Sequence, residues 1–149
     1  MNRAGLITPT NARRRGRSFI MLTYFWVSLG GAIGSAARFW VSGIVAQRFG
    51  QTFPYGTLVV NITGSFVVGL LAAMSVPEGR WFITPSARVF LMIGLCGGYT
   101  TFSSFSLQTL TLVQEGEWLR AAANSVASVV CCLVAVWLGY ACLNLINKP

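Results

Sequence analysis

The stretch Gly97-Gly98-Tyr99-Thr100-Thr101-Phe102-Ser103-Ser104-Phe105-Ser106 lies in the middle of an apolar segment that is long enough to span a membrane. A bilayer core holds no water to hydrogen-bond free backbone groups, so spanning segments are normally unbroken helices. Two adjacent glycines followed by five Ser and Thr side chains favour a break in such a helix. Non-helical backbone at this depth is tolerated only where it is buried in protein or lines a wet cavity. The stretch therefore predicts an ion site inside the membrane.

The composition is that of a membrane protein. Of the 149 residues, 54% are hydrophobic and 9% are charged, whereas soluble domains carry about 25% charged residues. Short links rich in turn residues separate four apolar segments, each long enough for a spanning helix: residues 19–45, 55–76, 87–113 and 119–146. We therefore expect an all-α, multi-pass membrane protein with four transmembrane helices and a break in the third. So small a bundle is expected to oligomerise.

The first twenty residues differ from the rest of the chain in charge. They hold five of the 11 basic residues and no acid: Arg3, Arg13, Arg14, Arg15 and Arg17. We interpret residues 1–20 as a basic extension, such as a membrane tether or targeting segment, or as the product of a start assigned too early, because Met21 directly precedes the first span. Residues 21–149 then form the transmembrane domain. Since the excess charge is concentrated in this tail, a nucleic-acid partner is a poor interpretation.

The loops between the spans are nearly balanced in positive charge. Arg80, Arg88 and Lys148 are expected on one side of the membrane, and Arg48 and Arg120 on the other. Without the tail, the positive-inside rule hardly fixes an orientation, and insertion in both directions with antiparallel pairing is compatible with the count. With the tail, the N-terminus is expected in the cytoplasm.

Asn61 and Arg38 are polar residues within spans. An amide inside a membrane is costly unless it is paired, so Asn61 is expected to face the bundle interior or a water-filled path. It either donates to an anion or holds two helices together. Arg38 either draws anions toward a vestibule or extends its guanidinium to the membrane surface.

Phe102 and Phe105 share a helical face. Aromatic rings have a positive edge, so two rings presented edge-on can contact an anion without binding it tightly; a packed aromatic pair is the alternative. Interleaved hydroxyl donors favour the anion path, since they can replace lost hydration: Thr101, Ser103, Ser104 and Ser106. Gln108 lies one turn further on. Asn124 and Ser128 share a face of the last span, where they continue a polar path or bond between helices.

An unwound turn at Gly97 to Thr101 frees backbone carbonyls, which can ligate a small cation; a glycine kink without an ion is the alternative. The absences are also informative. No Asp, Glu or His lies inside any span, which disfavours a proton-coupled exchanger and makes an enzyme improbable.

Two motifs in this order resemble those of the Fluc (CrcB-type) fluoride channel family: Gly-Thr-Leu-x-x-Asn-x-x-Gly-Ser-Phe at 56–66 and Gly-Gly-x-Thr-Thr-Phe-Ser-x-Phe-Ser at 97–106. A weaker match, Gly-Gly-x-x-Gly-x-x-x-Arg, ends at Arg38. The resemblance implies a dual-topology antiparallel homodimer with two fluoride pores. It also implies a structural sodium ion held by the carbonyls of Gly97 and Thr100, pore roles for Asn61, Phe102 and Phe105, and a vestibule role for Arg38.

The sequence departs from the family pattern in several places, including Cys132, which stands where some members have Ser. Gln108 stands where family members often have Glu, and the Arg-rich tail is not part of the pattern. A tail that fixes orientation suggests pairing with a paralogous subunit of opposite orientation. We predict a fluoride-selective channel in the cell (inner) membrane that exports fluoride passively and contacts fluoride, lipid and a second subunit. The rival interpretations are a small drug or proton exchanger and a non-transporting membrane scaffold.

Overall fold

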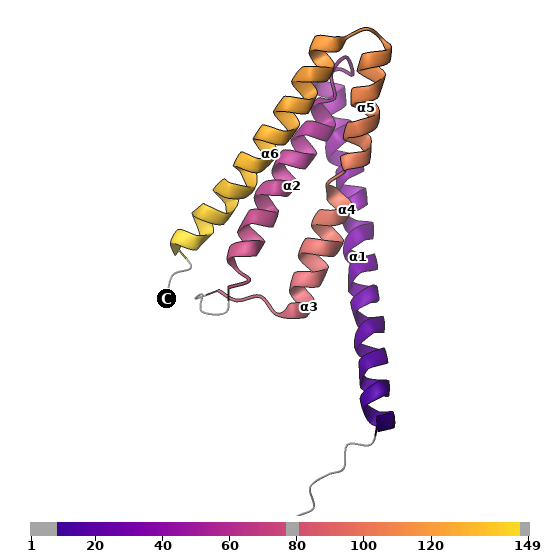
Figure 1. Ribbon diagram of the computed structural model, residues 1–149, viewed down its shortest axis with the longest axis vertical. Helices are drawn as coiled ribbons and strands as arrows, with labels where there is room; N and C mark the ends of the chain where they lie inside the picture. Colours follow the sequence, from indigo (N-terminus) through magenta and orange to yellow (C-terminus); the bar gives the residue numbers. More distant parts are fainter. Residues whose placement is uncertain (1–8, 77–80, 147–149) are drawn as a thin grey trace, which may run out of the picture.

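Helices make up all the regular secondary structure in the described part of the chain. The computed structural model describes residues 9–76 and 81–146, which form α1 (Pro9–Phe49), α2 (Tyr55–Ala73), α3 (Pro85–Arg88), π-helical η1 (Val89–Cys96), α4 (Gly97–Tyr99), α5 (Phe102–Gln114) and α6 (Trp118–Ile146) (Figure 1). Four stretches are long and apolar enough to cross a membrane: Ile20–Phe49, Tyr55–Ala73, Pro85–Gln114 and Trp118–Ile146. The prediction of an all-α membrane protein with four spans is confirmed.

Helix α1 begins earlier than the apolar pattern predicts. It starts at Pro9, where proline is compatible with a first helical turn because its missing N–H has no acceptor there anyway. The helix therefore continues through the second half of the predicted basic tail. Residues 1–8 of that tail lie outside the described residues, as do Arg80 and Lys148 of the predicted charge count.

The ends of the helices gather at two opposite poles. The start of α1, the end of α2, the start of α3 and the end of α6 lie at one pole, and the α5–α6 turn lies at the other (Figure 1). Arg48 in the last turn of α1 and Arg120 in the first turn of α6 belong to the second pole. This is the arrangement that four alternating spans require.

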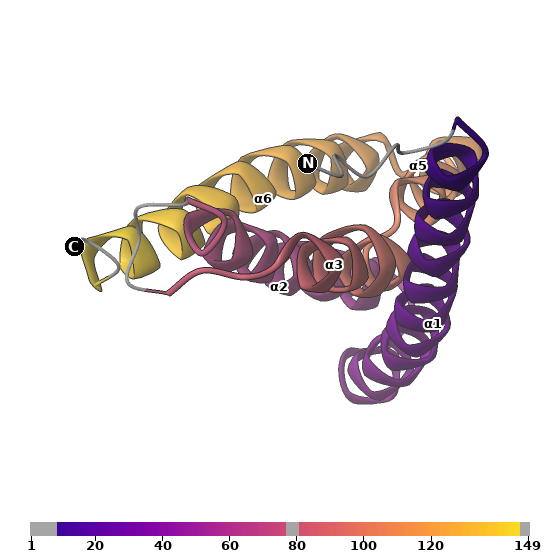
Figure 2. The ribbon, with the colours of Figure 1, turned by 90° about the horizontal axis from the view of Figure 1, so that it is seen from below.

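Glycines bring the helices of each packed pair close together. Helix α2 packs along α6, and α1 packs along η1 and α4 (Figure 2). A Cβ on Gly69 would meet the Val136 carbonyl oxygen of α6, and one on Gly139 would meet the Phe66 carbonyl oxygen of α2. In a membrane, helices gain little from hydrophobic association and are held by such close packing of small residues.

Large apolar side chains cover the outside of the molecule. Phe39 is 83% exposed, Leu119 84% and Phe102 78%. Water would not stabilise a surface of this kind, so these side chains face lipid or another subunit. The residues that are hidden from the surroundings include several polar ones, namely Thr57, Thr101, Asn124 and Ser128.

Candidate functional site: an interruption of the third span between two cavities

The third span contains two consecutive residues with extended backbone. Helix α4 ends at Tyr99, Thr100 has φ −78° and ψ 157°, Thr101 has φ −152° and ψ 112°, and α5 begins at Phe102. Gly97 keeps helical angles, with φ −64° and ψ −36°. The two extended residues thus occupy the end of the stretch from Gly97 to Thr101 in which the sequence predicts a break.

Asn61 of α2 binds both backbone polar groups of Thr101. The Thr101 N–H donates to Asn61 Oδ1 at 2.8 Å, and Asn61 Nδ2 donates to the Thr101 carbonyl oxygen at 3.1 Å. Thr101 is buried, with 7% of its surface exposed, so water cannot replace this partner. Of the two interpretations that the sequence leaves open for Asn61, the bond between helices is the one that the geometry shows.

The Thr101 hydroxyl starts α5. It accepts a hydrogen bond from the Ser104 N–H at 3.2 Å, which is the usual way in which a Thr side chain caps a helix N-terminus. Both Gly97 and Thr100 lose a helical partner here. In an unbroken α-helix the Thr101 N–H would donate to the Gly97 carbonyl and the Ser104 N–H to the Thr100 carbonyl, but these donors bind Asn61 and Thr101 instead.

The contact between α2 and the interruption leaves no room for a side chain at Gly64. A Cβ on Gly64 would collide with Thr100 Cγ2 and would lie 3.1 Å from Tyr99 Cδ1. The hydroxyl groups of Thr63 and Tyr99 lie 3.0 Å apart in a hydrogen bond. Gly64 therefore allows the extended residues to rest directly on α2.

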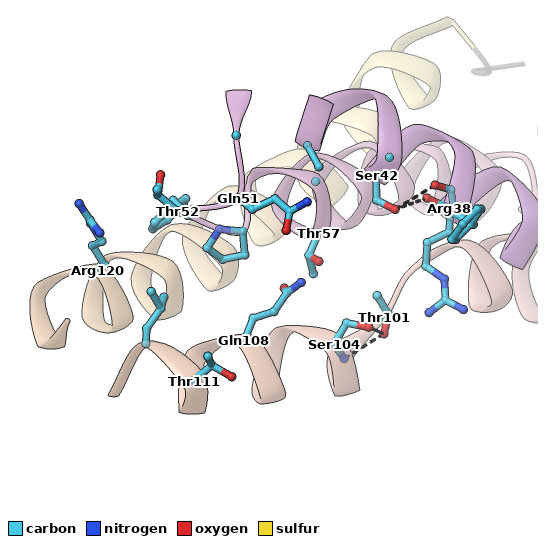
Figure 3. Close-up of a pocket in the computed structure, with 18 of the residues that line it drawn as sticks. Arg38, Ser42, Gln51, Thr52, Thr57, Thr101, Ser104, Gln108, Thr111 and Arg120 are labelled. Carbon is cyan, nitrogen blue, oxygen red and sulfur yellow. Dashed lines mark hydrogen bonds between the residues drawn. The ribbon is translucent and has the colours of Figure 1, made fainter. Parts of the chain in front are cut away.

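An open cavity of about 750 Å³ leads to one side of the interruption. Arg38 of α1 lies near Thr101 and Ser104, and Arg120 lies toward the opposite end (Figure 3). Thr57 of α2 and Gln108 of α5 project into the space between these two ends (Figure 3). Arg120 forms an ion pair of 3.2 Å with Glu117, so Arg38 is the cation of this cavity that no described carboxylate neutralises.

Gln108 carries a buried acceptor without a partner. Its Oε1 atom is the buried side-chain oxygen for which the described residues offer no hydrogen bond. Leaving such an atom unpaired costs about 1–3 kcal/mol. Because Gln108 also lines the first cavity, its side chain is a candidate for contact with an ion or with water in that cavity.

A second cavity of about 430 Å³ lies on the other side of the interruption. Its lining includes Asn61, Phe102, Phe105 and Ser128, and Thr101 lines both cavities. The two phenylalanine rings are tilted by 49° with their centroids 5.3 Å apart. The structure thus gathers these predicted pore residues around one buried threonine.

Other predicted residues lie elsewhere. Ser103 lines neither cavity and bonds to the Thr101 hydroxyl at 3.2 Å, and Ser106 donates to the Phe102 carbonyl at 2.9 Å. Asn124 is 2% exposed and donates to Thr109 Oγ1 at 2.8 Å, so it joins α6 to α5.

Thr57 and Ser65 line the cavities, yet sequence reasoning did not select them. The signal that was available is their spacing, because Thr57, Asn61 and Ser65 follow one another at intervals of four residues and so share a face of α2. Hydroxyl side chains, amides and one cation along these surfaces can replace the hydration of a small anion.

Comparison with known proteins gives a consistent result. The model of the family described as CrcB-like protein, Camphor Resistance (CrcB), matches residues 25–140. The fluoride-specific ion channel FluC of Rhodospirillum rubrum is 59% identical over 127 residues, covering 85% of this chain and 98% of the relative. The FluC proteins of Methylocella silvestris and Opitutus terrae are 53% and 57% identical, and cover 85% and 80% of this chain and 97% and 91% of their own.

These matches confirm the resemblance that the motifs indicate. They also confirm the predictions of a multi-pass membrane protein and of a chain that is not an enzyme, because the family consists of ion channels. This chain belongs to the CrcB-like family, to which the FluC channels belong.

Proposed function

We propose that this protein is a fluoride-selective channel through which fluoride leaves the cell passively across the cell (inner) membrane, which lowers its toxic concentration in the cytoplasm. The observation that carries the proposal is the extended pair Thr100–Thr101 in a membrane span, where Thr101 lies between a polar cavity and a mostly apolar one that contains Asn61 and Ser128. The names and high identity of the relatives support fluoride as the ion.

The first cavity supplies the donors that a fluoride ion needs. Fluoride is small and strongly hydrated, so a selective path must replace its water with closely spaced donors. The Arg38 guanidinium raises the local concentration of anions, and the hydroxyl groups of Thr57 and Ser104 and the Gln108 amide follow along the wall. Beyond the interruption, the edges of Phe102 and Phe105 and the Ser128 hydroxyl continue the path.

A structural sodium ion belongs to the same proposal. The carbonyl oxygens of Gly97 and Thr100 would hold it together with carbonyls of a second subunit, and oxygen ligands suit a hard cation. The fit rests on the release of both carbonyls from helical bonding by the Asn61 and Thr101 side chains. When bound, the cation would lower the cost of an anion nearby in a low-dielectric setting, and it is not transported.

The proposed assembly is an antiparallel homodimer, or a pair with a paralogous subunit of opposite orientation. Phe102 supports it, because this ring is 78% exposed although it lines the second cavity. A partner that covers Phe102 would close the cavity into a path. Apart from the arginines of the basic tail, the described cations near the ends of the spans, Arg48, Arg88 and Arg120, do not favour one orientation strongly.

The proposal is tested by reconstituting the full chain in liposomes and measuring fluoride and chloride efflux in sodium and in a large organic cation. We expect fast fluoride efflux, no chloride efflux, and a decline without sodium. Phe102→Ile should slow fluoride efflux in a protein that still assembles, whereas a scaffold would be unaffected. Equal chloride efflux, or efflux that requires a proton gradient, would contradict the proposal. If the homodimer gives no efflux and the chain conducts only together with a paralogous chain, the heterodimer is the functional assembly.

A further inference from the structure

We infer that Asn61 is a positioning residue that holds the third span open at Thr101 and thereby delivers the Gly97 carbonyl to the proposed cation site. The last part of this inference rests on the proposed function. The first part rests on hydrogen bonds alone.

The amide of Asn61 takes the donor that would otherwise close the helix. An unbroken helix would direct the Thr101 N–H to the carbonyl of Gly97, but this N–H lies 2.8 Å from Asn61 Oδ1. The Nδ2 group of the same amide holds the Thr101 carbonyl at 3.1 Å. Asn61 thus fixes the backbone of Thr101 at two points.

The residue type follows from this geometry. A side chain must accept and donate at once to bind both groups of one backbone residue, and a neutral amide does so, whereas a hydroxyl group is shorter and a carboxylate only accepts. Asn124 shows the contrast, because its amide donates to the Thr109 side chain and not to a backbone group. Among the described residues, Asn61 has this two-point hold on the interruption.

The hold extends to the pore-lining helix. Thr101 is the N-cap of α5, so the residue that Asn61 fixes is also the one that starts the helix carrying Phe102 and Phe105. One N–H of Asn61 is used in this way, and the second has no partner among the described residues. Because Asn61 lines the second cavity, this second N–H is available to an ion there.

Hydrogen exchange of the Thr101 amide tests the hold directly. The full chain is compared in micelles without fluoride as wild type, Asn61→Leu and Thr63→Val. The Thr63→Val control lies on the same helix and removes the neighbouring bond to Tyr99. We expect a protected Thr101 amide in the wild type and the control, and exchange at least about tenfold faster in Asn61→Leu. A wild-type Thr101 amide as exposed as that of Asn61→Leu would overturn the inference.

Asn61→Asp provides a second variant that does not depend on how well Asn61→Leu folds. The neutral carboxylic acid can accept and donate as the amide does, whereas the carboxylate still accepts the Thr101 N–H but cannot donate to the Thr101 carbonyl. Protection of the Thr101 N–H should therefore persist in both mildly acidic and alkaline buffer, in contrast to Asn61→Leu, while fluoride efflux should fall in alkaline buffer and that of the wild type should change little. The titratable or charged groups near this position are Arg38 on α1, Tyr99 on α4 and Cys132 on α6; α5 places the neutral Gln108 there.

The ion dependence of efflux separates positioning from direct contact with fluoride. A positioning role predicts that Asn61→Leu raises the half-saturating sodium concentration by about tenfold and changes the half-saturating fluoride concentration less. A shift in the fluoride value alone, with Thr101 still protected, would assign Asn61 to fluoride and overturn the inference. If the protein conducts no fluoride at all, the exchange experiment still decides whether Asn61 holds the interruption.

Discussion

Helix α2 makes two contacts of opposite kinds. At Gly69 and Gly139 it meets α6 so closely that no side-chain atom fits between the backbones. At Asn61 it reaches Thr101 of the third span through a side chain that makes two hydrogen bonds. The first contact closes the space between helices, and the second leaves a cavity on either side. Helix α2 therefore packs tightly against α6 through glycines, and contacts the third span through a polar side chain that borders the cavities.

This difference has an energetic counterpart. Close packing is the main source of helix association in a membrane, whereas hydrogen bonds between membrane helices contribute on average only about 0.6 kcal/mol each. We therefore expect mutations at the glycine contact to lower the free energy of unfolding. Mutations at the interruption are expected to affect conduction more than stability.

The largest effect on stability is expected from Gly139→Ala. The added methyl group would meet the backbone carbonyl oxygen of Phe66, which cannot move without shifting α2. We expect a loss of about 1–3 kcal/mol in the free energy of unfolding, measured by denaturant titration in micelles.

Gly31→Ala is the matched control, because a Cβ at Gly31 meets nothing within 4 Å. It makes the same chemical change in another spanning helix and should leave the free energy of unfolding unchanged or slightly higher. Equal stability of the Gly139→Ala and Gly31→Ala proteins would show that the backbones of α2 and α6 do not touch.

Thr101→Val should affect stability less and conduction more. The variant keeps the shape of the side chain and loses the cap of α5, which costs about 1 kcal/mol. A rise of about 1 kcal/mol in the barrier to ion passage corresponds to about fivefold in rate, so fluoride efflux should fall by about that factor. Thr101→Ser, which retains the hydroxyl group, should restore most of it. Normal fluoride efflux in Thr101→Val would show that the helix cap made by the Thr101 hydroxyl is not needed for conduction.

The glycines of the motif show what the sequence could and could not predict. Their adjacency indicates a break, yet Gly97 is helical and the extended residues are Thr100 and Thr101. Gly98 serves a different purpose, because a Cβ there would lie 2.5 Å from the Gly31 carbonyl oxygen of α1. Close approach of two helices and unwinding of one both favour glycine, and composition alone does not distinguish them.

The four spans were predictable because hydropathy follows local composition. The partners across helices were not, since Asn61 and Thr101 are 40 residues apart in the chain and nothing in either segment specifies the other. Ser106 illustrates the same limit: its hydroxyl suits a pore, but it donates to the Phe102 carbonyl one turn earlier in its own helix. A polar residue in a span indicates that it needs a hydrogen-bond partner, but the sequence does not identify that partner.

Gln108→Leu should change stability by no more than Thr101→Val does, and without the loss expected for Gly139→Ala. The variant removes the buried Oε1 atom that has no partner, so stability should stay the same or rise by about 1 kcal/mol. Fluoride efflux should nevertheless fall several-fold, because an amide is lost from the cavity wall.

Thermal unfolding and liposome efflux on one preparation of Gln108→Leu measure both quantities. A variant that is more stable and conducts less would show that Gln108 contacts the ion and that its unpaired oxygen lowers the stability of the fold. A variant that is less stable and conducts normally would show that Gln108 stabilises the fold, with its oxygen bound to a structural partner such as a buried water molecule.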